Sequence, residues 1–419
     1  MPQHYLIPAE PAGRNTLRVA LIVMMEPAAP GVGTPRAFLR VGGTTVARHQ
    51  LGLALAMECQ RIVCLSRQMT PDIIALQHVA ENAGAQFHVI AETRRLAGLV
   101  TANDELLVIS DGLLVSQQDA LKLLEGNHAV LVLPAETASN GGFERIDLNH
   151  ASAGLMRIPG RFVERLYELP ADCNVPSALT RIALQAGVAM REVPMVSREG
   201  AKWCIVRDEA EAHAIEGDWI GLHIVHVKGT RPATVMARLG VMIFGPSLLH
   251  SQSGTRLVGR VAVFVLLFAM GAGWLGLIVP GFVLCAIAAL LGEAAAMLRG
   301  VERNALDIPR PALSAGALFG WALDFTLIML LFWSVPITPW DTIMPWGTVP
   351  ERAFAPVTLV LMTRLVARIH AGNWVGWVSD RMLLSIVLAV AAGMGVAHEA
   401  VQILTIVIAL AGIVIFGRN

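Results

Sequence analysis

Hydrophobic residues are distributed differently in the two halves of the chain, and the change falls near residue 240. Before it, short apolar runs alternate with helical periodicity and with Gly and Pro. The run at 17–25 (LRVALIVMM) is continuously apolar, as in a strand buried on both faces of a parallel sheet. Beyond residue 240 the apolar runs reach membrane length. The pattern predicts an α/β domain followed by an all-α membrane domain.

The hydrophobic pattern of the first half predicts alternating strands and helices, which is the arrangement of βαβ units. The predicted strands are 17–25, 61–65, 86–90, 105–109, 129–133, 153–158 and 193–196. The predicted helices are 46–57, 71–83 and 175–185. We therefore expect a Rossmann-like sheet with helices on its faces.

The second half contains six apolar segments that can span a membrane if they tilt or bundle. They are 258–279, 281–298, 313–335, 354–369, 382–396 and 400–416. Arginines precede the first segment, follow the second, separate the fourth from the fifth and follow the sixth, while the opposite loops hold almost none apart from Arg352. The positive-inside rule then places both termini and the α/β domain in the cytoplasm. We expect a multi-pass protein of the cytoplasmic (inner) membrane.

A basic segment joins the two halves. Residues 228–249 combine Lys228, Arg231 and Arg238 with an apolar face, which is typical of an amphipathic helix on an anionic membrane surface. A short linker helix in solution is the alternative. The expected division is a tail at 1–16, the α/β domain at 17–227, a juxtamembrane helix at 228–256 and the membrane domain at 257–419.

Composition narrows the class of protein further. With 55% hydrophobic and 15% charged residues, the chain is too apolar for one soluble globule. Its 32 Lys and Arg balance 32 Asp and Glu, so no overall charge favours nucleic acid. The five cysteines lack C-x-x-C spacing, which argues against a disulfide framework or a zinc site. The first 16 residues lack the pattern of a secretory signal.

Two features of the first half are candidates for binding nucleotide phosphates. Gly31 and Gly33 lie in a Gly/Pro-rich loop after the first strand, where backbone amides can approach a phosphate. Asp111 follows the strand at 105–109, at the sheet edge where open α/β sheets bind ligands, and a carboxylate there can hold a divalent metal. The alternatives are a plain connecting loop and a turn or helix cap.

The stretch PRAFLRVGG at 35–43 resembles the P-K-A-L-L-P-V-x-G segment of sugar-phosphate and alcohol-phosphate nucleotidyltransferases, which follows a G-x-G-x-R loop. The resemblance implies a GT-A-like domain that binds nucleotide through Gly31, Gly33 and Arg36. It also implies that Asp111 holds Mg²⁺.

The chain departs from that family at several positions. Arg36 stands in place of a lysine, and arginine is a bulkier, delocalised cation. Ile205 and Arg207 fall where the family's closing W-x-D-I-D segment has two aspartates. These replacements predict a weakened two-carboxylate metal site.

Asp324 is an ionisable residue inside the predicted span 313–335, which makes it a functional candidate. A nucleotidyltransferase-like domain fused to six spans resembles the bifunctional alcohol-phosphate cytidylyltransferase/CDP-alcohol phosphotransferases of polar-lipid synthesis. Residues 320–328 resemble that family's G-x-x-x-D-x-x-x-D, with Ile328 in place of the base. Its D-x-x-D-G motif is reduced to a weak match in which Leu291 replaces a metal aspartate and Glu293 is the acid nearby. The resemblance implies metal ligation by Asp324 and Glu293, and pairing of Asp324 within the bundle is the alternative.

Residues that the two resemblances expect for metal binding or catalysis are replaced in both halves of the chain, and this favours one hypothesis. The protein is expected to serve membrane-lipid head-group synthesis as a catalytically weakened binding or partner subunit, which binds CTP or a CDP-alcohol and Mg²⁺. A homodimer or a complex with an intact lipid-synthesis enzyme is compatible with the small-residue-rich spans. The first alternative is a nucleotidyltransferase that is active only through the α/β domain. The second is a lipid or small-molecule transporter with a regulatory domain.

Overall fold

The computed structural model describes residues 16–29, 33–136, 141–170, 173–225, 231–250, 254–304, 314–335, 345–369 and 373–416. The chain divides into two compact units, one formed mainly by residues up to 215 and the other mainly by residues from 216 onward. The first, the α/β unit, contains the strands, and the second, the helical unit, is built from helices. This division confirms the fold class predicted from the hydrophobic pattern.

A seven-stranded sheet forms the centre of the α/β unit, in the order β10-β8-β9-β6-β1-β4-β5. Strand β1 pairs in parallel with β4 and β6, while β9 runs antiparallel between β6 and β8. The strands of this sheet are β1 (Arg18–Val23), β4 (Arg61–Leu65), β5 (Gln86–Ile90), β6 (Glu105–Ile109), β8 (Ala129–Pro134), β9 (His150–Pro159) and β10 (Ala189–Glu192). Two small sheets pair β2 (Arg40–Val41) with β3 (Thr44–Thr45) and β7 (Leu113–Val115) with β11 (Trp203–Ile205).

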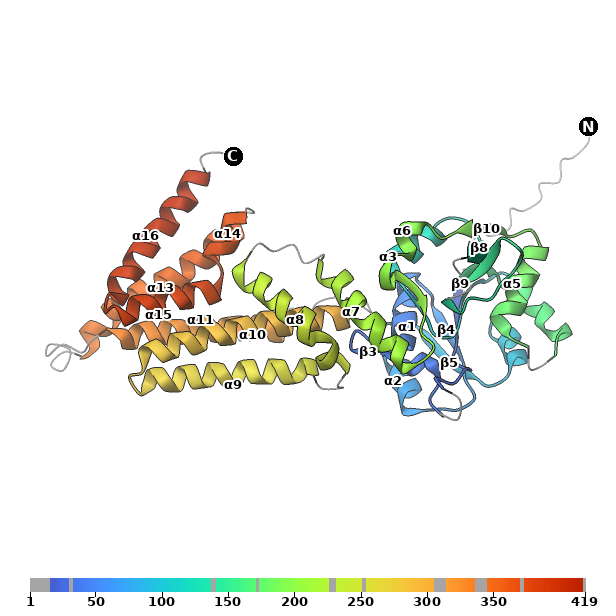
Figure 1. Ribbon diagram of the computed structural model, residues 1–419, viewed down its shortest axis with the longest axis horizontal. Helices are drawn as coiled ribbons and strands as arrows, with labels where there is room; N and C mark the ends of the chain where they lie inside the picture. Colours follow the sequence, from blue (N-terminus) through green and yellow to red (C-terminus); the bar gives the residue numbers. More distant parts are fainter. Residues whose placement is uncertain are drawn as a thin grey trace, which may run out of the picture. The chain divides into compact units, whose positions relative to one another are not determined.

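Alternate residues of β1 enter two different hydrophobic cores, as the continuous apolar run predicts. Ala20 and Ile22 pack with α1 to α3, and Val19 and Leu21 pack with η2, η3 and α5 on the other face. Figure 1 shows α1 and α5 on opposite sides of the sheet. The helices of this unit are η1 (Arg36–Phe38), α1 (Val46–Ala56), α2 (Pro71–Asn82), η2 (Thr93–Gly98), α3 (Gln117–Leu124), η3 (Gly160–Glu168), α5 (Val175–Gln185), α6 (Met195–Arg198) and η4 (Gly200–Lys202).

The prediction of a strand at 193–196 is wrong. The strand in this part of the chain is β10, which ends at Glu192, and Met195–Arg198 forms the short helix α6. Val193 still donates its backbone N–H to Val132, at 2.9 Å. Pro194 then ends the pairing because proline has no N–H to donate, and it becomes the N-cap of α6.

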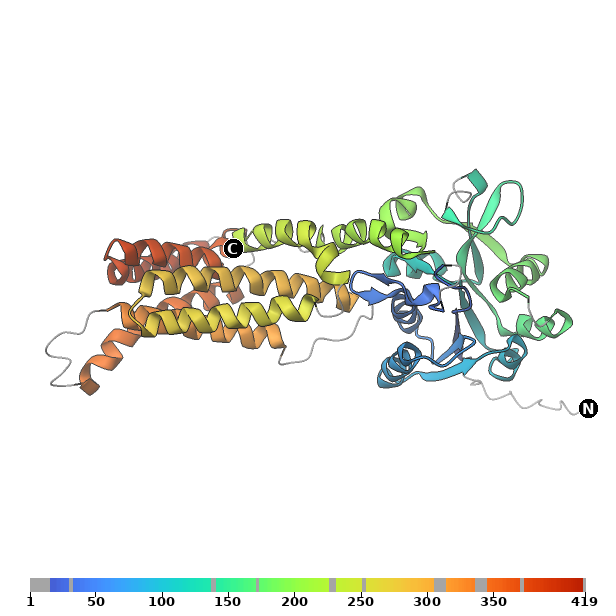
Figure 2. The same ribbon diagram turned by 60° about the horizontal axis from the view of Figure 1, so that its bottom comes forward.

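The helical unit packs its helices around one apolar core. Figures 1 and 2 show α9 and α10 side by side. Three helices are long and apolar enough to cross a membrane, namely Gly254–Trp274, Ile278–Val301 and Ala315–Ser334. The helices from α7 onward are α7 (Glu209–Val225), α8 (Pro232–His250), α9 (Gly254–Trp274), α10 (Ile278–Asn304), α11 (Ala315–Ser334), α13 (Pro345–Ile369), α14 (Asn373–Val378), α15 (Arg381–Gly393) and α16 (Ala397–Phe416).

The remaining predicted spans also fall on helices, but the apolar parts of α15 and α16 are shorter than those of α9 to α11. The count of six spans therefore stays a prediction. The interfacial position of the juxtamembrane helix also stays a prediction. The corresponding helix, α8, leaves the apolar side chains of Leu239, Ile243 and Phe244 exposed on its surface. The first predicted span, 258–279, extends beyond the end of its helix. Helix α9 ends at Trp274, and Gly276 adopts a positive φ of 79° in the turn before α10 begins.

Candidate functional site

The α/β unit has a cavity at the carboxyl ends of β1, β4 and β6. Strand β1 is followed along the chain by β4 on one side of it and later by β6 on the other, so the strand order reverses at β1. Open α/β sheets bind ligands in the crevice at such a reversal. The cavity there measures about 460 Å³. Side chains that follow these three strands line it, including Met25, Arg67 and Asp111.

Asp111 lies at the inner wall of this cavity, where it is 8% exposed. Its Oδ2 atom accepts hydrogen bonds from the backbone N–H groups of Met25, at 2.6 Å, and Glu26, at 2.7 Å. Its Oδ1 atom is buried and has no hydrogen-bond partner among the described residues. One carboxylate oxygen therefore holds the loop after β1 in place, and the other is left for a cation or a proton.

Burial raises the pKa of Asp111 to about 7. The backbone N–H groups of Glu26 and Met25 and the charge of Arg36 act in the opposite direction, since each favours the ionised carboxylate. A positive charge placed at Oδ1 would remove part of the cost of burial. The group is thus suited to binding a cation that arrives with a ligand.

Arg36 lines the cavity from the short helix η1 and forms an ion pair with Glu26. The aliphatic part of its side chain passes over Gly112, where an added Cβ would lie 2.7 Å from Arg36 Cδ and 2.7 Å from the carbonyl oxygen of Val206. Gly112 also has a positive φ of 69°. The glycine after Asp111 therefore leaves room for the Arg36 side chain, so that Asp111 and Arg36 line the same cavity.

The predicted glycine loop is placed differently from the expectation. Gly31 lies outside the described residues. Gly33 is exposed and does not line the cavity. The loop folds back on itself, because Ala28 donates its backbone N–H to Thr34 at 2.9 Å and Pro27 bridges to Pro35. Of the four residues predicted to bind nucleotide, Arg36 and Asp111 are brought together.

The family resemblance places two acids at positions 205 and 207, and the structure places Ile205, the last residue of β11, in the wall of the cavity. Ile205 pairs with Leu113 across the β7–β11 ladder, and Val206 donates its N–H to Gly112 at 2.8 Å. Arg207 instead pairs with Glu211, with 2.8 Å between its Nε and Oε1. The wall therefore presents an apolar side chain where the resemblance has a second carboxylate.

Several polar residues that line the cavity were not identified from the sequence, among them Arg67, Asn174, Ser177 and Glu144. Arg67 follows β4 as Asp111 follows β6, so the same strand-end argument would have found it. Asn174 caps α5 by accepting the Ser177 N–H at 3.2 Å, and Ser177 donates its hydroxyl to Glu144. Their only signal was the N-cap position of a predicted helix.

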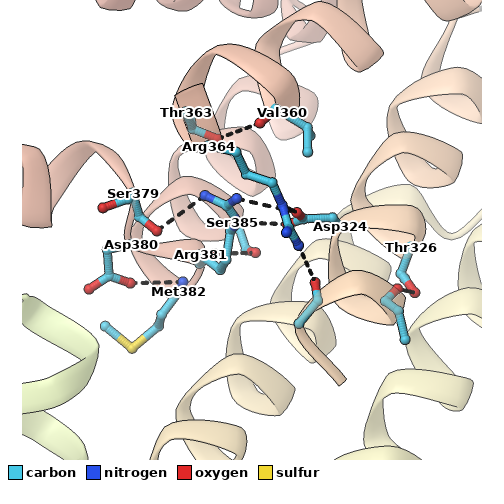
Figure 3. Close-up of polar contacts among 12 residues, drawn as sticks. Asp324, Thr326, Val360, Thr363, Arg364, Ser379, Asp380, Arg381, Met382 and Ser385 are labelled. Atoms are coloured by element: carbon cyan, nitrogen blue, oxygen red, sulfur yellow. Dashed lines mark hydrogen bonds and ion pairs between the residues drawn. The ribbon is translucent and has the colours of Figure 1, made fainter. Parts of the chain in front are cut away.

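The two acidic candidates of the helical unit have different surroundings. Glu293 lines a second cavity from α10. Asp324, on α11, is 3% exposed and forms ion pairs with Arg364 and Arg381. Figure 3 shows the two guanidinium groups meeting at its carboxylate. No cluster of three or more His, Cys, Asp or Glu side chains suitable for a metal occurs within the described ranges.

Comparison with solved structures finds nucleotidyltransferases, which match about half of this chain. A putative glucose-1-phosphate thymidylyltransferase from Bacillus anthracis is 12% identical, with a TM-score of 0.38, over 48% of this chain and 94% of that one. The inositol-1-phosphate CTP transferase from T. maritima is 13% identical, with a TM-score of 0.35, over 47% of this chain and 92% of that one. The UDP-glucose pyrophosphorylase from Acinetobacter baumanii is 10% identical, with a TM-score of 0.38, over 51% of this chain and 95% of that one.

No protein-family model matches the chain. No curated protein matches it either.

Proposed function

We propose that the α/β unit binds a nucleotide, or a sugar or alcohol phosphate, in the cavity at the carboxyl ends of β1, β4 and β6. The observation that supports this most is the Asp111 carboxylate, whose buried Oδ1 has no partner among the described residues, beside the Arg36 side chain. Arginine recruits phosphate oxygens, and a carboxylate recruits the cation that accompanies them. Together they suit a nucleotide with its bound metal.

The residues present fit one Mg²⁺ held through Asp111, since Mg²⁺ often takes one protein carboxylate and completes its shell with water and phosphate oxygens. Bound Mg²⁺ would neutralise charge on the phosphates. Ile205 offers no second oxygen, and Glu26 is paired with Arg36. The protein's own groups therefore support binding and orientation of a phosphate better than rapid nucleotidyl transfer.

We accordingly propose that the protein is a membrane-held binding or partner subunit in the synthesis of phospholipid head groups. The helical unit, with three helices that suit a membrane, would attach the α/β unit to the membrane. Substrates of head-group synthesis are phosphorylated alcohols and their nucleotide derivatives, which the Arg36 and Asp111 side chains can recognise.

A second candidate function is nucleotidyl transfer by the α/β unit alone. It is favoured by the Oδ1 atom of Asp111, which has no hydrogen-bond partner in the described part of the chain, because a single well-placed metal ion can still stabilise charge on a reacting phosphate. Arg36 would then take the role of the family's lysine, with a guanidinium that binds two phosphate oxygens at once.

The test is nucleotide binding by the purified full chain in a neutral detergent with Mg²⁺, measured by calorimetry with CTP, UTP, ATP and dTTP. Arg36→Gln and Asp111→Asn should each weaken binding of the preferred nucleotide by about 10-fold or more, since each removes a charged contact to it. The matched control is Arg94→Gln, because Arg94 is exposed and does not line the cavity.

Pyrophosphate release separates the two candidate functions. Binding without release from CTP and glycerol or inositol phosphate supports the binding subunit, whereas release that Asp111→Asn abolishes supports the transferase. Absence of binding to all four nucleotides and to glycerol phosphate and inositol phosphate contradicts both.

A further inference from the structure

We propose that the second cavity, in the helical unit, binds a phosphate-bearing anion through arginines and without a divalent metal. This site is separate from the α/β cavity and does not depend on the function proposed for it. The cavity measures about 340 Å³, which is enough for a phosphate or a small lipid head group. It lies among α10, α11, the carboxyl end of α13 and the start of α15.

Charge is the first argument. Four arginines line the cavity, namely Arg231, Arg364, Arg368 and Arg381, against two carboxylates, Glu293 and Asp380. The Asp380 carboxylate is already used as a helix cap, since its Oδ1 accepts the N–H of Met382 at 2.9 Å and its Oδ2 that of Ala233 at 2.7 Å. Even when Asp324, which pairs with Arg364 and Arg381, is counted with them, the four arginines outnumber the three carboxylates.

The second argument is that two of these guanidinium groups are held in place. Arg364 pairs with Asp324, donates Nη2–H to the Gly320 carbonyl at 3.2 Å and stacks 3.8 Å from the centre of the Trp321 ring. Arg381 donates from Nε to Asp324 at 2.6 Å and from Nη1 to Ser379 at 3.1 Å. Both arginines appear around Asp324 in Figure 3. Fixed guanidinium groups lose little conformational entropy when an anion binds.

These contacts do not use all the donors. A guanidinium group has more N–H donors than Arg364 and Arg381 spend on their partners. Arg368 lies one turn beyond Arg364 on α13 and makes no ion pair or side-chain hydrogen bond with the rest of the described chain. Planar donors converging on one cavity match the oxygens of a phosphate group.

The arrangement also explains why no metal is required. Both oxygens of Asp324 are held by guanidinium groups, so the carboxylate is a positioning group for Arg364 and Arg381. Glu293 is the acid that remains on this wall, and Arg231 is its electrostatic neighbour. The arginines would supply the positive charge that a metal provides in other phosphate sites.

The experiment uses the full chain in a neutral detergent with EDTA. Two probes are titrated separately by calorimetry, inorganic pyrophosphate and dihexanoyl phosphatidic acid, with dihexanoyl phosphatidylcholine as the comparison lipid. We expect binding of an anionic probe, weakened about 10-fold or more by Arg368→Gln and by Arg231→Gln, because each variant removes a charged contact. Both positions leave the Asp324 pairs intact.

Two controls show where the anion binds. Arg260→Gln removes an exposed arginine of α9 that does not line the cavity and should change affinity by at most about twofold. Arg256→Gln, which removes a second exposed arginine of α9 outside the cavity, should likewise leave this binding unchanged. Binding of both probes indicates recognition of the phosphate itself, and binding of phosphatidic acid alone indicates a lipid head group. The proposal is overturned if neither probe binds, if binding requires Mg²⁺, or if a control variant weakens it as much as Arg368→Gln does.

Discussion

At the scale of single residues, Asp111 shows how burial and hydrogen bonding divide one carboxylate between two tasks. Oδ2 is fixed by the Met25 and Glu26 amides, and Oδ1 has no described partner. Its place after β6 was predictable from the sequence, because a polar residue that ends a buried strand lies at the ligand-binding edge. The separate surroundings of its two oxygens were not predictable, since they depend on a loop 85 residues away.

Binding of a divalent cation at Asp111 should depend on pH. Because burial raises the pKa of Asp111 to about 7, a proton occupies the carboxyl below that pH and competes with the cation. Affinity for Mn²⁺, measured by electron paramagnetic resonance on the full chain, should therefore be about 10-fold lower at pH 6 than at pH 8.

Two variants decide whether Asp111 causes this dependence. Asp111→Asn should abolish the pH-dependent part of the binding, whereas Asp72→Asn, at an exposed position of α2, should retain it. A flat affinity between pH 6 and pH 8 in the unchanged protein would contradict the assignment of the cation to Asp111.

At the scale of elements, Asp380 joins two helices that are far apart in the sequence. Its Oδ1 caps α15 through Met382 and Leu383, and its Oδ2 accepts the N–H of Ala233 in the first turn of α8, 147 residues earlier. The side chain is 2% exposed. A buried carboxylate shared by two helix N-termini stabilises both, because each N-terminus carries partial positive charge.

Asp380→Ala should lower the thermal midpoint of the helical unit by more than loss of a single cap does. A lone cap is worth about 1 kcal/mol, and here two are lost along with the attraction of a buried charge. Scanning fluorimetry of the full chain in detergent measures the change. The control is Ser314→Ala, which removes one cap bond, from Ala317 to Ser314 at 3.2 Å. Equal shifts for the two variants would show that the link to α8 contributes nothing.

The hydrophobic pattern along the chain was sufficient to predict the bounds of some elements but not of others. The pattern located β4, β5, β6 and α5 to the residue, since each is a run of uniform character bounded by turn residues. It failed at 193–196, where Pro194 ends the pairing. Apolar runs also could not show where α9 stops and α10 starts, because the turn at Gly276 is itself apolar.

At the scale of the whole molecule, the arginines of the second cavity come from chain segments that the positive-inside rule assigns to the cytoplasm. Arg364 and Arg368 end α13, and Arg381 begins α15. The predicted orientation and the proposed anion site thus place positive charge on the same side of the membrane, where anionic lipid and phosphorylated metabolites are found.

Reporter fusions test this orientation in bacteria. Green fluorescent protein fused to the C-terminus should fluoresce, because the predicted C-terminus is cytoplasmic. Alkaline phosphatase fused after Gly276, in the turn between α9 and α10, should be active, because that turn is predicted to lie outside. An active phosphatase at the C-terminus would contradict the orientation, and carbonate extraction of the chain from membranes would contradict a membrane span.

The sequence by itself determined the division into two units, most of the strands and helices of the first, the apolar helices of the second and the positions of its unusual acids. These follow from burial, which local apolar patterns report directly. The tertiary structure decided what the acids do, because partners are chosen by packing between distant segments. Asp324 meets Arg364 and Arg381, which are 40 and 57 residues away, and so becomes the holder of two guanidinium groups. No local pattern encodes that pairing, and it changes the prediction at this cavity from a metal site to an anion site.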